Sequence, residues 1–158
     1  MMITIMLQLL CCTFLQGVII VGIQIITDNC CDLPHELLER YKVIVVPLRV
    51  RFGDEEIPPE NFDNATFYNR LKTSPQLPST SQPMPGDFLV QYQKAIEQNQ
   101  QIISIHLSSG ISGTVQSANI AAEMLTGEPI HIIDSRKASV GQGLMVLEAA
   151  RMAVSGEE

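Results

Sequence analysis

The chain has little basic charge and few aromatic side chains. Tryptophan is absent, aromatic residues make up 5% of the 158 positions, and ten basic residues stand against seventeen acidic ones, giving a formal net charge of −7. Nucleic-acid-binding proteins carry basic stripes, so DNA and RNA are not expected partners. A hydrophobic content of 46% is ordinary for a folded α/β domain, and a chain of this length has room for one such domain.

The sequence also lacks the spacings of a metal or disulfide site. Its four cysteines form two adjacent pairs, Cys11–Cys12 and Cys30–Cys31, which match neither a CxxC zinc motif nor a spread disulfide framework. The three histidines form no HxxxH or HExxH set. We therefore expect no metal, reduced thiols and a cytoplasmic location.

Charge is missing altogether from residues 1–27, a length that would suit a membrane span. Polar residues interrupt this run, however, and it has neither basic flanks nor a small-x-small cleavage site. Residues 23–27 also resemble a buried strand. We expect residues 1–22 to be an extension outside the native fold that does not span a bilayer. A mis-assigned start, an extra element packed on the domain and a membrane or export segment remain the three alternatives.

From residue 23 onward, β-branched runs alternate with segments of 3.6-residue periodicity, which is typical of βαβ units. The pattern predicts a three-layer α/β domain with a mostly parallel sheet of about four central strands, at residues 23–27, 43–46, 101–107 and 130–133. Helices are expected around residues 33–41, 67–71, 85–96, 115–125 and 143–154. Residues 49–57 alternate polar and apolar side chains around a Gly-Asp turn and predict an edge hairpin.

Two hydroxyl-rich loops carry the functional signal. Residues 108–114, Ser-Ser-Gly-Ile-Ser-Gly-Thr, follow an apolar strand and lead into a helix, whose free N–H groups and dipole favour an anion. Residues 78–83 have the same character. Since ligands of open α/β sheets bind beyond the carboxyl ends of the strands, the two loops predict a site for a small acidic ligand.

Structural roles are open for the same residues. Ser109 and Ser112 would serve equally well as caps of the helix that follows. Thr80 and Ser81 would be ordinary turn residues before a proline.

The strand-end residues favour a structural role. Asp28 and Asp134 are expected to accept backbone N–H bonds, and His106 is expected to be packed or hydrogen-bonded rather than a base. Ser112 lacks the GxSxG context of a serine hydrolase, and no P-loop lysine follows the glycines. A binding protein without a catalytic residue of its own is therefore favoured.

Four motifs in this order resemble those of the DegV family of bacterial fatty-acid-binding proteins, and the likeness runs from residue 23 to residue 158. They are Thr27-Asp28 with Asp32-Leu33-Pro34, then Thr80-Ser81-Gln82-Pro83, then residues 108–114, and finally Asp134-Ser135.

The resemblance implies a ligand and a division of labour. Residues 23–158 would be the N-terminal α/β domain, which holds the carboxylate of a long-chain fatty acid through loop hydroxyls. A C-terminal acyl-tunnel domain is expected to be absent from this chain. A separate fatty acid kinase would receive the bound fatty acid and form an acyl phosphate, and no other cofactor is implied.

The resemblance also implies the site residues. Thr80 and Ser112 would contact the head group, and the full ligand-binding set is Thr80, Ser81, Ser109, Gly110, Ser112 and Gly113. The residues expected to support this set are Asp28, Asn29, Asp134 and Ser135. Asn29 departs from the TDS sequence usual in the family, which leaves its role open.

One enzyme alternative remains. The chain would instead be a phosphotransfer domain related to dihydroxyacetone kinase or to sugar phosphotransferase components. That function requires a phosphate-accepting histidine at the strand ends, and His106 is the candidate.

Overall fold

The computed structural model describes residues 22–58 and 62–156. The predicted extension, residues 1–22, lies outside the described residues except for Gly22. Within the described ranges, no helix is both long enough and apolar enough to cross a membrane.

A four-stranded parallel sheet forms the centre of the molecule. Its strands are β1 (Ile23–Asp28), β2 (Ile44–Val46), β6 (Gln101–His106) and β7 (Ile130–Asp134), in the order β2-β1-β6-β7. All three pairings are parallel, so the four carboxyl ends meet at one edge. The four predicted strands are confirmed, and the polar carboxyl ends of β1, β6 and β7 fall together as expected.

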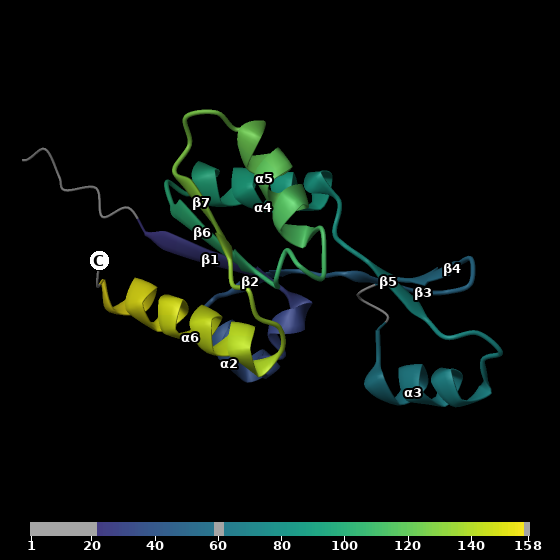
Figure 1. The fold of residues 1–158 in the computed structure, drawn as a ribbon. Helices are drawn as coiled ribbons and strands as arrows, with labels where there is room; N and C mark the ends of the chain where they lie inside the picture. The colour runs from purple at the N-terminus through teal and green to yellow at the C-terminus, as the bar shows by residue number, and fades with distance from the viewer. Residues whose placement is uncertain (1–21, 59–61, 157–158) are drawn as a thin grey trace, which may run out of the picture.

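Helices cover both faces of this sheet and make a three-layer α/β fold (Figure 1). Helices α4 (Pro85–Glu97) and α5 (Thr114–Glu123) lie on one face, and α2 (His35–Arg40) and α6 (Val140–Ser155) lie on the other. Strand residues alternate between the two apolar layers. Ile26 and Ile102 pack toward α4 and α5, whereas Ile25 and Ile105 pack toward α6, and all four are at most 2% exposed.

A second, smaller sheet projects from the first (Figure 1). Strands β3 (Arg49–Phe52) and β4 (Glu55–Ile57) form the predicted hairpin, and β5 (Ser79–Ser81) pairs with the other side of β3 in antiparallel register. The sequence predicts a loop over residues 78–83, whereas its middle is this strand. A polar segment became a strand because β3 offers it an unpaired edge, a non-local feature that local composition does not reveal.

Helix α3 (Asn64–Thr73) packs against the small sheet through aromatic side chains. Phe67 contacts both Phe52 and Phe62, with ring centroids 5.7 and 5.3 Å apart. Arg70 lies over the Phe52 ring and pairs with Glu55. The hairpin and α3 therefore form a satellite core beside the main one.

The predicted last helix begins earlier than expected, at Val140 instead of Gly143. Gly143 lies so close to the short 3-10 helix η1 (Asn29–Cys31) that a Cβ there would come within 2.3 Å of the Cys31 carbonyl oxygen. The glycine thus permits the amino-terminal end of α6 to pack directly behind β1, at the carboxyl edge of the sheet.

Candidate functional site

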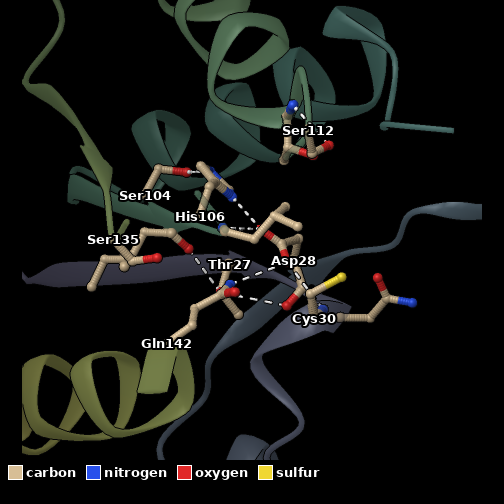
Figure 2. Close-up of polar contacts among 12 residues, drawn as sticks. Thr27, Asp28, Cys30, Ser104, His106, Ser112, Ser135 and Gln142 are labelled. Atoms are coloured by element: carbon tan, nitrogen blue, oxygen red, sulfur yellow. Dashed lines mark hydrogen bonds and ion pairs between the residues drawn. The ribbon is translucent and has the colours of Figure 1, made fainter. Parts of the chain in front are cut away.

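Polar side chains gather in the interior at the carboxyl ends of β1 and β6 (Figure 2). Thr27, Asp28, Ser104 and His106 all have 0% exposure, although each carries groups that need hydrogen-bond partners. The two strands are neighbours in parallel register, with Thr27 opposite Ile105, which places these residues side by side.

These side chains form a directed chain of hydrogen bonds. The Tyr92 hydroxyl, from α4, donates to Ser104 Oγ at 2.9 Å, and Ser104 Oγ lies 2.7 Å from His106 Nε2. His106 Nδ1 lies 3.1 Å from Asp28 Oδ2. Because Ser104 Oγ accepts from Tyr92, its own proton is free for Nε2, which leaves Nδ1–H to donate to the carboxylate. Every proton in this chain then has an acceptor.

The Asp28 carboxylate accepts hydrogen bonds from three further residues. The Leu107 backbone N–H donates to Oδ2 at 3.0 Å, while the Cys30 N–H and Gln142 Nε2 donate to Oδ1 at 3.0 and 3.1 Å. Burial alone would raise the pKa of Asp28, but the hydrogen bonds from His106, Leu107 and Gln142 hold it below its ordinary value. Asp28 is thus an ionised anchor that ties β1, β6 and α6 together.

Gln142 comes to this network from the first turn of α6, and its side chain is fully buried. Its Nε2 also donates to Thr27 Oγ1 at 3.2 Å. Its Oε1 is the one buried side-chain nitrogen or oxygen atom for which the described residues provide no hydrogen-bond partner.

The Ser104–His106–Asp28 arrangement has the order of a catalytic triad but is sealed from solvent. Both His106 ring nitrogens are already hydrogen-bonded, and Ser104 and His106 have 0% exposure. A phosphoryl donor therefore cannot reach His106 in this conformation. The residue that the phosphotransfer alternative requires is a packed, hydrogen-bonded histidine, as the sequence favoured.

The loop after β6 is bonded to the loop after β7. Ser109 donates its hydroxyl to Asp134 Oδ2 at 2.6 Å and its backbone N–H to Asp134 Oδ1 at 3.2 Å, and the Arg136 N–H donates to the same carboxylate. The Ser109 hydroxyl and these backbone N–H groups lower the pKa of Asp134. Ser135 bonds locally, donating its hydroxyl to the Lys137 carbonyl. Ser109 is thus engaged in holding its own loop, and Gly110, which donates its N–H to Ser108 Oγ, lies exposed beside it.

Ser112 stands at the start of α5. Its Oγ is 2.9 Å from Thr114 Oγ1 and accepts the Thr114 N–H at 3.3 Å, while Gly113 is the N-terminal cap and provides no side-chain bond. Ser112 thus makes the helix-start contacts of a cap and is half-buried.

An open groove of about 760 Å³ separates the carboxyl edge of the main sheet from the small sheet. Its residues come from both parts: Asn29, Cys30, Asp32, Leu33, Pro34, Leu48, Val50, Phe62, Asn64, Thr80, Ala138 and Ser139. A recess of about 220 Å³ adjoins it and shares Asn29, Leu48, Val50 and Phe62, adding Pro47 and Ile57. The groove is therefore lined by polar and apolar side chains together, with Thr80 paired opposite Val50.

The structure brings the predicted residues together only in part. Thr80 and Asn29 line the groove, and Asn29 uses its Oδ1 to accept the Leu48 N–H at 3.0 Å. Ser81 is exposed on β5. The Ser112 loop meets the β5 segment at a different point, where the Gln82 carboxamide lies against Gly113.

Several groove residues were missed by the sequence reasoning. Cys30 lines the groove, and burial together with Asp28 and Asp32 raises the pKa of its thiol to about 11. Leu48, Val50 and Phe62 form the apolar wall. The alternation of residues 49–57 identified the hairpin, but no local signal shows that one of its faces borders a ligand groove.

Metal chemistry has no donor set here: among the described residues, no three His, Cys, Asp or Glu side chains cluster in a way that could hold an ion. The fold and the groove define a class of protein, a three-layer α/β domain with an open, partly apolar groove beside the carboxyl edge of its parallel sheet.

Within that class the chain belongs to the DegV family, because residues 22–158 match the family model described as an uncharacterised protein of the DegV family. A DegV domain-containing protein of Clostridium perfringens is 40% identical over 135 residues, which cover 85% of this chain and 48% of the relative. The chain spans about half the length of the curated relatives it matches.

Solved structures share the fold. A DegV family protein from Thermus thermophilus, described for its fatty acid binding, superposes with a TM-score of 0.79 at 35% identity, covering 87% of this chain and 49% of that one. A stearic acid-binding protein from Eubacterium ventriosum gives 0.78 at 29% identity, covering 85% and 48%. The predicted family and fold class are confirmed.

Proposed function

We propose that this chain is the part of a fatty-acid-binding protein that holds the carboxylate of a long-chain fatty acid. The groove between the two sheets carries the proposal, because it presents the polar side chains of Thr80 and Asn29 beside an apolar wall of Leu48, Val50 and Phe62. Similar proteins that are described as fatty-acid-binding support the choice of ligand.

The polar and apolar lining residues of the groove suit the two parts of the ligand. A carboxylate requires a few well-placed donors, which the Thr80 and Ser112 hydroxyls would supply. An alkyl chain gains about 0.8 kcal/mol for each methylene that it buries. The apolar wall would therefore provide affinity, and the Thr80 and Ser112 hydroxyls would provide orientation.

Because the groove is open, this chain by itself should cover only part of a long alkyl chain and bind it more weakly than an enclosed tunnel would. We infer that a further domain, of the size by which the relatives exceed this chain, supplies the rest of an acyl tunnel. The complete protein would present the bound fatty acid to a separate kinase, which phosphorylates the carboxylate to an acyl phosphate. We place this function in the cytoplasm, where thiols such as Cys30 stay reduced.

The native thiol of Cys30 offers a direct test of groove occupancy. Cys30 lines the groove and is half-buried, whereas its neighbour Cys31 is buried. The 158-residue chain is treated with a maleimide with and without stearate, and labelling of the peptide that carries Cys30 is followed by mass spectrometry. Stearate is expected to slow labelling of Cys30, while octadecanol, which lacks the carboxylate, protects less.

A matched variant separates head-group binding from nonspecific lipid association. Thr80→Val keeps the shape of the side chain but removes the hydroxyl, so protection by stearate should weaken toward that given by octadecanol. Labelling of Cys30 that is indifferent to stearate at every concentration below its solubility limit would rule out the groove as the binding site.

A further inference from the structure

Gln82 occupies a position that the fold holds firmly. It follows β5 directly, and the preceding residue, Ser81, is paired with Arg49 of β3. It precedes Pro83, whose side chain is fully buried. A residue before proline is confined to extended conformations, so the backbone at Gln82 has little freedom, and side chains two apart on an extended chain, such as Thr80 and Gln82, leave it on the same side.

The Gln82 carboxamide fills the space that a side chain at Gly113 would need. A Cβ built on Gly113 would lie 2.6 Å from Gln82 Nε2, 2.9 Å from Cδ and 3.1 Å from Oε1. Gly113 has a φ of −78°, which any residue adopts, so backbone conformation does not require glycine here. Glycine is required here because the Gln82 carboxamide approaches so closely.

The donors and the acceptor of the Gln82 carboxamide are available for hydrogen bonding. Among the residues that the structure describes, none makes a hydrogen bond with the Gln82 side chain, and the residue is exposed. It lies against Gly113, the cap of α5, next to Ser112. Two neutral N–H donors therefore stand between the β5 segment that carries Thr80 and the helix start that carries Ser112.

We propose that Gln82 is a further head-group residue, whose carboxamide donates to the ligand carboxylate from its seat on Gly113. This inference rests on the proposed function and adds to it a residue that joins the two hydroxyl loops into one site. A carboxamide suits the task because it donates without contributing charge, and its rigid backbone and its contact with Gly113 limit the conformational entropy lost on binding.

Three variants of the 158-residue chain test the inference through stearate binding. Gln82→Met retains the length of the side chain but has no donor, and Gln82→Glu retains its shape but replaces the donors by negative charge. Gly113→Ala displaces the carboxamide from its seat while leaving Gln82 in place. We expect Gln82→Met and Gly113→Ala to weaken binding about tenfold, since hydrogen bonds to a charged group have this magnitude, and Gln82→Glu to weaken it further by repulsion.

The double variant and a control distinguish donation from general damage. The double variant Gln82→Met/Gly113→Ala should bind stearate with the same affinity as whichever single variant binds it less tightly, because both changes remove the same contact. Gln93→Met, at an exposed glutamine of α4, should bind as the unmodified chain does. All variants should unfold at the denaturant concentration of the unmodified chain, because Gln82 is exposed and the added Cβ at Gly113 meets only the flexible end of the Gln82 side chain.

The outcomes separate the inference from the proposed function. If the unmodified chain binds stearate and Gln82→Met binds it equally well, Gln82 is not a head-group residue although the function stands. Strictly additive losses in the double variant would also overturn the shared contact. If the unmodified chain binds no stearate, the proposed function fails first, and the role of Gln82 fails with it.

Discussion

Two polar regions lie at the same edge of the sheet, and they differ in whether their side chains already have hydrogen-bond partners within the protein. In the buried region, Asp28, His106 and Ser104 have 0% exposure and bond to one another, to other buried side chains or to the backbone. In the exposed region, formed by Thr80 in the groove and by Gln82 beside Gly113, no hydrogen bond joins these two side chains to any residue that the structure describes. In the first region the hydrogen-bond donors are paired with acceptors of the protein, whereas in the second region they remain available to a ligand.

The difference separates scaffold from binding surface. A buried charge is tolerated only when its partners surround it, so the Asp28 network fixes the relative positions of β1, β6 and α6. The loops that leave these strand ends are held by the same anchor, and that rigidity lets a few exposed hydroxyls act together. Changes in the buried region should therefore affect folding, and changes in the groove should affect binding.

Removal of the Asp28 carboxylate should have the largest effect on stability. Asp28→Ala leaves four donors without an acceptor in the interior, from His106, Leu107, Cys30 and Gln142. We expect the free energy of unfolding to fall by about 3–5 kcal/mol, measured by urea denaturation. Asp54→Ala, in the exposed hairpin turn, is the matched control and should change it by less than about 0.5 kcal/mol; similar losses in both variants would refute the anchor role.

Acid should weaken the buried region in a defined direction. The folded protein holds the pKa of Asp28 below its ordinary value, so the unfolded chain takes up the proton more readily. The stabilisation is fully present above the unfolded pKa of about 3.9 and is lost as the pH falls through the folded pKa. Unfolding measured between neutral pH and pH 3 should therefore show a smaller loss of stability in Asp28→Asn than in the unmodified chain, and parallel pH profiles would contradict this.

A substitution at Thr80 should have the opposite effect, leaving stability unchanged and weakening stearate binding. Thr80→Val removes one hydroxyl from the groove while suiting a strand, so stability should stay within about 0.5 kcal/mol of the unmodified chain. Stearate binding, measured by titration calorimetry, should weaken about tenfold. Thr73→Val, at the far end of α3, tests whether any exposed threonine has this effect, and equal losses from the two substitutions would remove Thr80 from the site.

The sequence specified the local features of both regions and missed their long-range contacts. The β-branched runs located all four strands, and Asp28 was expected to accept backbone N–H bonds. Its side-chain partners His106 and Gln142 lie 78 and 114 residues away, and the parallel register that brings them together is a property of the whole sheet. The β5 strand was missed for the same reason, since its pairing edge belongs to a distant hairpin.

The smallest predicted effect tests the direction of the buried chain of hydrogen bonds. Tyr92→Phe removes the donor to Ser104 Oγ and little else, because the ring remains packed beside Phe88. At neutral pH we expect a loss of about 1 kcal/mol in the free energy of unfolding and unchanged stearate binding. Burial raises the pKa of Tyr92 to about 12, so its contribution is complete below the unfolded pKa of about 10 and is lost as the pH rises toward the folded value. The stability gap between the unmodified chain and Tyr92→Phe should therefore narrow between pH 10 and 12, because only the unmodified chain carries that titrating hydroxyl; a gap that is constant across this range would show that the hydroxyl is not buried in solution.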